Sequence, residues 1–480
     1  MNPIKKLVIN KNDAILTISV IGKAKVIDTI KKDIQFNCKD VVGLVIDPHE
    51  FLYLVRSSIN AMLVKNPKLV IDEIEIIGDM NSLLFCDKVS GTALTPAFIL
   101  KDERSLKEIS NIKKTSYAKQ YRDITQQEVS LYSWFSFLTW FNSQGLNLYN
   151  INLKKCFCMS LESYLLLNLT GKRENVIDLA TASSSGIFDY FNWEFSSSII
   201  KDLDIPMGCL PLIIKESRTN YYTQGFVPLK DNIEISSFKS QDFFRWEIMP
   251  KKGYGSINIH ISENDISIQT YLGGEDTPVK PGCQKVIFSN TKISSICVKD
   301  VIQISRLQSQ VINKEFKDVV AEKRQHAPEN IWMVMNGASE QSKNQFALIK
   351  LNQSDKQEHI LDAYLEGIFH MIKMKLNQFQ EFYEITQQDI FCTSTISVNE
   401  NIWGILSNCI QSSMVFINYE MLCAMPEIYF VNAEKPENTT VKVSRKKKLP
   451  LTFLMPELDP ISSYARYQKW MSFYRKIFEN

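Results

Sequence analysis

The chain has 480 residues, a length typical of two or three domains. Hydrophobic residues make up 45% of it, charged residues 22%, and the formal net charge is +2. These values exclude a collagen, a disordered chain and a bundle of membrane spans, and they give no basic surface of the kind that nucleic acid requires. Glycine is scarce, with 17 residues, about half the usual frequency of ~7%.

Cysteine and histidine usage predicts no metal or redox centre. Ten cysteines are scattered along the chain, and only Cys156 and Cys158 lie close together, in a C-x-C pattern that is typical of neither a zinc nor a redox site. The five histidines have no metal-ligand spacing. We expect reduced, mostly buried thiols in a cytoplasmic protein. No signal-peptide core and no apolar run near ~18 residues is present, so no membrane association is expected.

The first half of the chain reads as a mixed α/β layer followed by helices. The predicted elements are strands within 6–28, a helix after Asp47-Pro48 through 51–64, a strand over 68–78, two strands over 83–100 around a turn at Ser90-Gly91, and helical pieces over 120–205 broken at Gly145, Gly171 and Gly186. Residues 215–255 are rich in polar and turn residues, and we place a domain boundary there.

The second half repeats the α/β theme. We predict strands at 256–262, in PENIWMVMNGA and in EITQQDIFCTSTIS, a helix over 358–378, a helix in NIWGILSNCIQ, and a helical tail. The helix over 358–378 carries a core-facing apolar stripe, formed by Leu361, Leu365, Ile368, Ile372 and Leu376. The basic run SRKKKLP at 444–450 reads as a solvated loop.

Seven segments, in this order, resemble the FGGY carbohydrate kinases, which phosphorylate sugars and polyols with ATP. They are IDPHEF at 46–51, IIGDMNSLLFCDKVSGTALTPAFILKDERS at 76–105, NLTGKRENVIDLATASSSGIFD at 168–189 with the following FNWEFSSSIIKDLDIP, LGGEDTPVKPGCQKVIFSNTKIS at 272–294, LEGIFHMI at 365–372, STISVNENIWGILSNCIQ at 394–411, and the tail MPELDPISSYARYQKWMSFYRKIF. The central block is the most specific of them.

The resemblance implies an α/β fold of two ribonuclease-H-like (actin-like) domains with an interdomain cleft. Residues 1–245 would form the sugar-side domain, and residues 246–480 the nucleotide-side domain with a C-terminal helical tail. A small carbohydrate or polyol would bind mainly to the first domain, and ATP with Mg²⁺ to the second. Phosphoryl transfer needs mostly positioning and charge compensation from the protein. Dimers and tetramers are common in the family, so a homodimer is one expected state.

The first phosphate hairpin of the family, GIDIGTTSIK, corresponds to VINKNDAIL in this chain. Asn10 stands where the family has its metal-binding aspartate, and Asn12 and Asp13 replace the glycine and the first threonine. An aspartate in a phosphate-facing turn repels the anion that the turn should hold. An ordinary Asn/Asp β-turn is the competing interpretation.

The other nucleotide-side positions have also lost glycine. The family's GTSG aligns with Ser289, Asn290, Thr291 and Lys292, and its adenine-side GGG aligns near Thr395, Ile396 and Ser397. Lys292 could offer a positive charge to phosphate, or it is a solvated turn lysine. Side chains in place of glycine would crowd a surface meant for a nucleotide.

The general base is ambiguous. Asp265, with Glu263 beside it, is the carboxylate within one residue of the place expected from the resemblance, and it reads either as the base or as a turn aspartate. The positions that bind sugar in the family are closer to the family pattern than the nucleotide-binding positions are. Asp79 and Met80 stand where the family has Gln-Met before a sugar-contacting residue, and Asp102 and Arg104 keep its D-x-R pair, which suits polyol hydroxyls or fixes a loop.

Two functions follow from these residues. One is a pseudokinase: a family member impaired or inactive as a kinase, acting as a ligand- or protein-binding module without ATP or metal. The other is a functional, divergent ATP- and Mg²⁺-dependent sugar or polyol kinase with Asp265 as general base. Asp178 and the SSSG turn at 183–186 are expected to stabilise a connection rather than to bind a ligand.

Overall fold

The structure is a computed structural model, and it describes residues 4–22, 25–40, 43–100, 104–131, 133–171, 174–216, 218–249, 254–262, 265–272, 279, 283–288, 296–304, 315–335, 346–349, 356–385, 389–417 and 451–479. These residues form two compact units. The first holds the described residues up to Met249 together with 284–288 and Ile296, and the second holds the others from Tyr254 onward. The change of unit falls a few residues beyond the expected boundary between 245 and 246. None of the described helices is both long and apolar enough to cross a bilayer.

The first unit is built on a six-stranded sheet with the order β14-β15-β6-β1-β2-β3. Its strands are β1 (Lys5–Asn12), β2 (Ile15–Gly22), β3 (Lys25–Asp33), β6 (Glu73–Gly78), β14 (Arg218–Tyr222) and β15 (Glu234–Ser240). Strands β1, β2 and β3 form an antiparallel meander, whereas β6 pairs in parallel with both β1 and β15. The carboxyl ends of β1, β6 and β15 therefore meet at one edge of the sheet.

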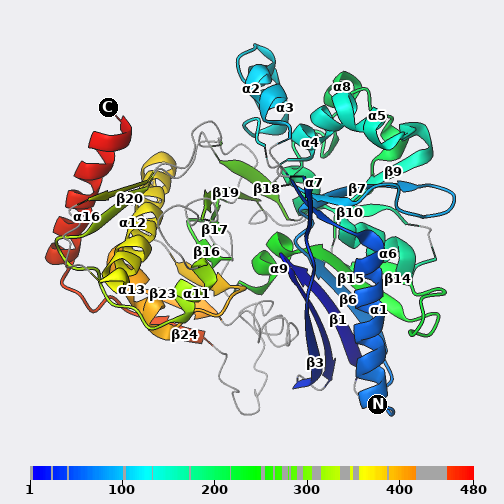
Figure 1. Cartoon of the computed structure of the whole chain (residues 1–480), viewed down its shortest axis with the longest axis horizontal. Coiled ribbons are helices and arrows are strands. Elements are labelled where there is room, and N and C mark those ends of the chain that lie inside the picture. Colours follow the sequence, from blue (N-terminus) through cyan, green and yellow to red (C-terminus); the bar gives the residue numbers. More distant parts are fainter. Residues whose placement is uncertain are drawn as a thin grey trace, which may run out of the picture. The chain divides into compact units, whose positions relative to one another are not determined.

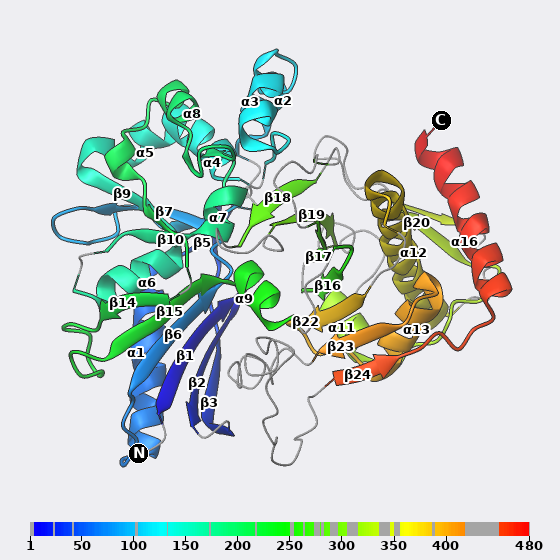
Figure 2. The ribbon, with the colours of Figure 1, turned by 180° about the vertical axis from the view of Figure 1, so that it is seen from behind.

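Local sequence explains how this layer is covered. Helix α1 (Pro48–Lys65) starts at a proline in its first turn, and the Asp47 side chain accepts hydrogen bonds from the next backbone N–H groups. Its buried residues include Phe51, Val55, Ile59 and Met62, spaced three or four apart. That apolar face packs on the sheet, along which α1 runs in Figures 1 and 2. The strands and the helix predicted for this part of the chain are confirmed.

A second, five-stranded sheet in the first unit has the order β4-β5-β8-β7-β9. It contains β4 (Asn37–Asp40), β5 (Gly43–Ile46), β7 (Ser82–Asp87), β8 (Ala97–Ile99) and β9 (Cys156–Met159). Strands β7 and β8 are the pair predicted around Ser90-Gly91, and Gly91 takes a φ of 67°, which favours glycine. Cys156 and Cys158 lie buried as free thiols in β9, as expected.

The middle of the chain is less uniformly helical than the sequence suggested. The helices are α2 (Leu106–Ile112), α3 (Tyr117–Thr125), α4 (Trp134–Trp140), the π-helix η1 (Phe141–Gly145), α5 (Leu146–Tyr149), the 3₁₀ turn η2 (Leu153–Lys155), α6 (Leu161–Leu169), α7 (Leu179–Ser184), α8 (Ser197–Asp202) and the 3₁₀ turn η3 (Met207–Cys209). Short strands interrupt them: β9, β10 (Val176–Asp178), β11 (Phe188–Asp189), β12 (Glu194–Phe195) and β13 (Leu212–Ile214). The helical pieces predicted over 120–205 are present, but the strands between them were missed because they are too short to show a period of two.

The polar segment 215–255, in which the sequence analysis placed a domain boundary, supplies β14, β15 and α9 (Gln241–Ile248) to the first unit, and the change of unit follows them. Strand β15 reads EISSFKS, and its polar residues occupy positions that a half-buried strand normally fills with apolar ones. Pairing in the sheet overrides that weak local signal.

The second unit has the strand order β19-β17-β16-β22-β23-β24. The strands are β16 (Ile257–Ile261), β17 (Asp265–Tyr271), β19 (Ile296–Gln303), β22 (Ile390–Ser394), β23 (Met414–Ile417) and β24 (Leu451–Leu454), with a separate pair, β20 (Trp332–Met335) and β21 (Phe346–Ile349). Its helices are α11 (Phe316–Ala321), α12 (Gln357–Tyr383), α13 (Glu400–Ile410), α16 (Pro460–Tyr474) and the π-turn η5 (Arg475–Glu479). The five stripe residues predicted on α12 are all buried, which confirms their place in the core.

The two units repeat one topology. Each opens with an antiparallel hairpin, β1–β2 in the first unit and β16–β17 in the second. In each, a third strand extends the meander and the first strand also pairs in parallel with a later one, β6 or β22. This arrangement is the ribonuclease-H-like sheet that the sequence predicted. Strand β18 (Gln284–Ile287) belongs with the first unit, where it packs against α7.

Candidate functional site

A buried charge cluster lies where β1 and β6 end. Lys11 is 1% exposed because it shares a face of β1 with Leu7 and Ile9, which belong to the core. Its Nζ lies 2.5 Å from Oδ1 of Asp79, which directly follows β6, and 3.4 Å from Oε1 of Glu162 in α6. One ammonium is therefore held between two carboxylates inside the first unit.

The same Asp79 carboxylate holds the turn of the first hairpin. Its Oδ2 accepts a hydrogen bond of 2.8 Å from the backbone N–H of Asp13. Asp13 has a φ of 45°, and Met80 next to Asp79 has a φ of 48°, so both bends lie in the left-handed region that side chains other than glycine seldom adopt. A phosphate at this turn would have to displace the Asp79 carboxylate from the Asp13 N–H and would meet the Asp13 carboxylate as well. These residues do not fit a triphosphate.

Glu162 completes the cluster from the helix side. It is 1% exposed, and no N–H or hydroxyl group of the described residues donates a hydrogen bond to its carboxylate, whose polar neighbours are Lys11 and the Asp79 carboxyl group. The side chain packs directly on Gly78, where an added Cβ would lie only 2.2 Å from Glu162 Cγ. Gly78 is therefore needed so that the carboxylate can approach the end of β6.

The pKa values follow from this geometry. Burial lowers the pKa of the Lys11 ammonium, but the charges of Asp79 and Glu162 outweigh burial and raise it overall. Burial raises the pKa of Asp79 to about 6; Lys11 offsets part of that rise, whereas Glu162 adds to it. The cluster therefore keeps a permanent positive charge beside a carboxylate that binds its proton unusually tightly.

On the other side of the sheet, the Asn10 amide is also engaged. The Gln241 side chain, at the start of α9, donates through Nε2 to Asn10 Oδ1 at 2.6 Å and to the Lys11 carbonyl at 3.2 Å. Asp178 fixes this helix start, because its Oδ2 accepts from the backbone N–H of Ser240 at 2.7 Å while its Oδ1 caps α7. Asp178 thus stabilises a connection, as the sequence analysis expected. Asn12 is partly exposed at the end of β1.

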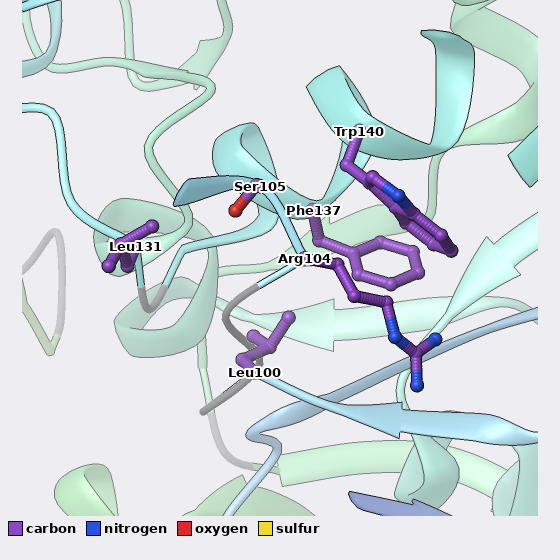
Figure 3. A pocket seen from close by; sticks show the side chains of 6 residues that line it. All are labelled: Leu100, Arg104, Ser105, Leu131, Phe137 and Trp140. Atoms are coloured by element: carbon purple, nitrogen blue, oxygen red, sulfur yellow. The ribbon is translucent and has the colours of Figure 1, made fainter. Parts of the chain in front are cut away.

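The predicted sugar-side residues are split between the cluster and a separate pocket. Arg104 lines a narrow pocket with Trp140 and Phe137 (Figure 3), together with Leu100, Ser105 and Leu131. Its guanidinium lies 5.1 Å from the ring centroids of both Phe98 and Trp140, a cation–π arrangement. Met80 is buried and its sulfur accepts a hydrogen bond from Thr181. Asp102 lies outside the described residues.

The remaining residues predicted to bind the nucleotide are only partly described. Asp265 is the first residue of β17, and its carboxylate accepts a 2.9 Å hydrogen bond from Ser262 Oγ across the β16–β17 turn. Ser397 is exposed in the connection from β22 to α13. Asn290, Thr291 and Lys292 lie outside the described residues. The role of Asp265 as base stays a prediction.

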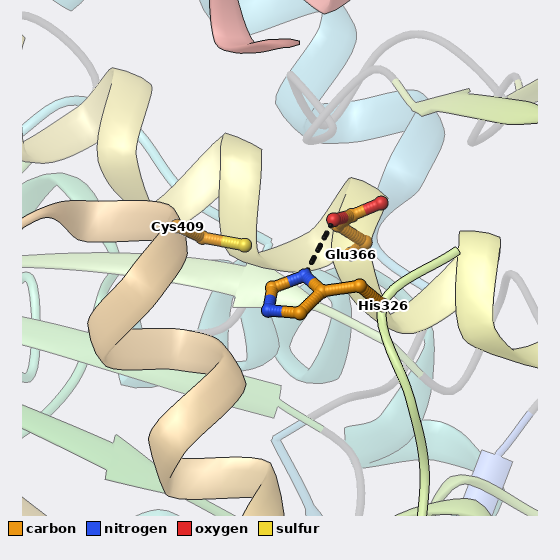
Figure 4. Close-up of side chains that lie close together, drawn as sticks. All are labelled: His326, Glu366 and Cys409. Atoms are coloured by element: carbon orange, nitrogen blue, oxygen red, sulfur yellow. Dashed lines mark hydrogen bonds and ion pairs between the residues drawn. The ribbon is translucent and has the colours of Figure 1, made fainter. Parts of the chain in front are cut away.

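The second unit holds a polar cluster that resembles a metal site only at first sight. His326, Glu366 and Cys409 place their ligand atoms within 4.8 Å of one another (Figure 4). The hydrogen bonds already use these groups: His326 Nδ1 is 3.0 Å from Glu366 Oε1, and Arg466 of α16 donates to both Glu366 oxygens, at 2.9 and 2.5 Å. Hydrogen bonding from His326 and the charge of Arg466 outweigh burial and lower the pKa of Glu366.

This polar cluster fastens the C-terminal segment to the rest of the second unit. The Nδ2 atom of Asn408, in α13, lies 3.2 Å from Nε2 of His326. The Oδ1 atom of Asn408 accepts hydrogen bonds from the backbone N–H groups of Glu457 and Leu458. Arg466 also donates to the carbonyl of Ala327. A divalent ion here would have to displace a guanidinium from its carboxylate, so the arrangement is a structural clamp for α16.

Two α/β units with the hairpin-and-parallel-strand order described above define an actin-like protein of the ribonuclease-H class. Residues 15–225 match the model of the "FGGY family of carbohydrate kinases, N-terminal domain". This match assigns residues 15–225, rather than the whole chain, to the FGGY carbohydrate kinase family.

Individual relatives agree with this assignment. The chain is 26% identical over 149 residues to a glycerol kinase of Myxococcus xanthus, and 26% identical over 161 residues to one of Borreliella burgdorferi. These alignments span about a third of each chain, 31% of this one and 30% of the Myxococcus protein in the first case.

Solved structures share the fold over nearly the whole chain. Plasmodium falciparum glycerol kinase with ADP superposes with a TM-score of 0.80 at 14% identity, covering 99% of both chains. Gluconate kinase from Lactobacillus acidophilus superposes with a TM-score of 0.76 at 13% identity, covering 98% of this chain and 97% of the other. At such low identity the likeness establishes the fold alone.

Sequence reasoning missed three residues around the end of β1. Lys11 had a usable signal, because the alternation Leu7, Ile9, Lys11 points all three side chains to one face. Glu162 is the one carboxylate within the apolar helix LESYLLLNL, which is a second signal. Gln241 had none, because it meets Asn10 only through a contact 231 residues apart in sequence.

Proposed function

We propose that this protein is an FGGY-family member that is impaired or inactive in phosphoryl transfer and that acts as a binding module for a small carbohydrate or polyol or for a protein partner. The observation that carries the proposal is the hydrogen bond from the Asp13 N–H to Asp79. This bond occupies the Asp13 N–H, a donor that a phosphate would need if the turn worked like the phosphate hairpin that it resembles in the FGGY kinases. The residues of this turn do not fit ATP or Mg²⁺.

Three further features support the proposal. Asn10 is a neutral amide where the resemblance expects a metal-binding carboxylate, and its oxygen already accepts from Gln241. The Asp13 carboxylate adds negative charge to the turn. Lys11 cannot reach out to a phosphate, since its ammonium is buried and paired with Asp79 and Glu162. One ammonium faces three carboxylates here, so the turn carries net negative charge before any ligand arrives.

The ligand expected for the module follows from the first unit. Asp79, Met80, Asp102 and Arg104 are the proposed substrate-binding residues, and carboxylate and guanidinium groups suit adjacent hydroxyls. A cytoplasmic location and a homodimer are part of the same proposal. The alternative is a functional, divergent ATP-dependent sugar or polyol kinase with Asp265 as general base. It is favoured by a partly exposed carboxylate fixed at the hairpin turn of the second unit.

The test is calorimetric titration with Mg-ATP, paired with an ADP-release assay over a panel of sugars and polyols. We expect no saturable heat at millimolar Mg-ATP and no sugar-dependent ADP release. The double variant Asn10→Asp/Asp13→Thr, which restores the family residues, should gain affinity, whereas Asp123→Asn, a matched loss of one exposed carboxylate on α3, should not. Sugar-dependent turnover by the natural protein that Asp265→Asn abolishes would replace the proposal by the alternative.

A further inference from the structure

The carboxylates around Lys11 form an oxygen-lined pocket for a cation. Asp79 contributes Oδ1 and Glu162 contributes Oε1 to the same Nζ, at 2.5 and 3.4 Å. The carboxylate of Asp13 also acts on the ammonium electrostatically. Carboxylate oxygens are the donors that hard divalent cations prefer.

Glu162 supplies the independent sign that this pocket is built for a cation. Its side chain is 1% exposed, and no N–H or hydroxyl group of the described residues donates a hydrogen bond to it; its polar neighbours are the Asp79 carboxyl group and the Lys11 ammonium. Two adjacent buried carboxyl groups are costly unless a positive charge lies beside them. The neighbouring positive charge within the described part of the first unit is the Lys11 ammonium.

We propose that Lys11 is a tethered cation: its ammonium fills an oxygen-lined site formed by Asp79 and Glu162 and thereby excludes a divalent metal ion. The first hairpin turn is then held on Asp79 without any dissociable ion. The inference goes beyond the proposed function, because it concerns the turn itself and stands whether or not the chain transfers phosphate.

The chemistry of the two occupants explains why they exclude each other. An ammonium on a four-carbon stem is a compact point charge that donates in three directions. A divalent ion would need the same oxygens at 2.0–2.6 Å and would lie in the space of Nζ. Because Lys11 is covalently attached, it is always present at the site, whereas a free ion must be bound from solution.

The test removes the tethered cation while keeping the oxygens. Lys11→Ala should leave a cavity lined by two carboxylates that takes up Mn²⁺, whereas Lys11→Met should fill the space with a neutral side chain and take up none. After treatment with a chelator, each protein is measured by thermal unfolding with and without MnCl₂, and by the loss of the free Mn²⁺ electron paramagnetic resonance signal. At Mn²⁺ about 100-fold above its Kd, the Lys11→Ala protein should melt about 5 °C higher.

The controls make every outcome decisive. The natural protein, Lys11→Met and the triple variant Lys11→Ala/Asp79→Asn/Glu162→Gln should shift by less than about 1 °C and leave the Mn²⁺ signal unchanged. Stoichiometric Mn²⁺ binding by the natural protein that Asp79→Asn/Glu162→Gln abolishes would overturn the proposal. So would a Lys11→Ala protein that ignores Mn²⁺, or one that stays unfolded when refolded in its presence. None of these measurements contains nucleotide, so their failure is distinct from that of the proposed function.

Discussion

Gly78→Ala should destabilise the first unit strongly. The new Cβ would lie 2.2 Å from Cγ of Glu162 and 2.7 Å from its Cδ and Oε1, distances that no two such atoms tolerate. Glu162 is buried, so it must leave its place beside Lys11 or push α6 away from β6. Overpacking costs typically ~1–3 kcal/mol, and separating a buried ion pair costs about 3–5 kcal/mol. We expect a loss of about 3 kcal/mol in the free energy of unfolding.

Urea unfolding combined with hydrogen exchange of the peptides that contain β1 and β6 would assign this loss to the first unit. Gly404→Ala is the matched control, because nothing lies within 4 Å of the added Cβ in helix α13, and alanine is favoured over glycine in a helix by ~1 kcal/mol. Truncating the opposing side chain with Glu162→Ala should remove most of the cost of Gly78→Ala. An equal cost in both backgrounds, or a loss below about 1 kcal/mol, would refute the reasoning.

Three other predictions concern the charged groups. Asp79 binds its proton more tightly in the folded state, with a pKa of about 6 against 3.8, so its contribution to stability should be full below about pH 4 and should be lost, by up to ~3 kcal/mol, as pH rises through 6. In a plot of the urea midpoint against pH, Asp79→Asn should flatten the region between pH 4 and 6. An unchanged plot would contradict the assignment. Asp178→Ala removes two hydrogen bonds from a buried carboxylate and should cost about 2–3 kcal/mol in urea unfolding. The matched loss of an exposed cap in Asp459→Ala should cost clearly less, and equal losses would show that the bond to Ser240 adds nothing. Arg466→Met leaves Glu366 buried without its cation and should speed proteolysis at α16 at least tenfold, whereas Lys469→Met should not. A chelator should leave the proteolysis of the natural protein unchanged. Release of α16 by the chelator would instead show a metal at His326, Glu366 and Cys409.

Much of the scaffold could be predicted because its signals are local. The alternation of β1 and β2, the start of α1 at Pro48 and the apolar stripe of α12 are each readable within about twenty residues. The order of the family-like segments added the two ribonuclease-H-like units. The short strands β9 to β13 were missed because two to four residues carry no period, and β15 was missed because its polar residues are buried by sheet pairing.

The site was harder to predict, because it is built from long-range contacts. Lys11 contacts Asp79 and Glu162, which are 68 and 151 positions away in the sequence. The role of Lys11 depends on this pairing of its ammonium rather than on its residue type. The sequence identified Asn10, Asp13 and Asp79 as separate features of two motifs, one nucleotide-side and one sugar-side. The hydrogen bond between Asp13 and Asp79 joins the two motifs into one, and no pattern in the sequence indicates it.

A crystal structure of the protein grown with Mg²⁺ and a non-hydrolysable ATP analogue would test the central claim most directly. The account predicts that the Asp13 N–H still donates to Asp79, that Lys11 still lies between Asp79 and Glu162, and that no phosphate oxygen comes within hydrogen-bonding distance of the turn. A γ-phosphate that accepts from the Asp13 N–H, with the Asp79 carboxylate turned away, would contradict it.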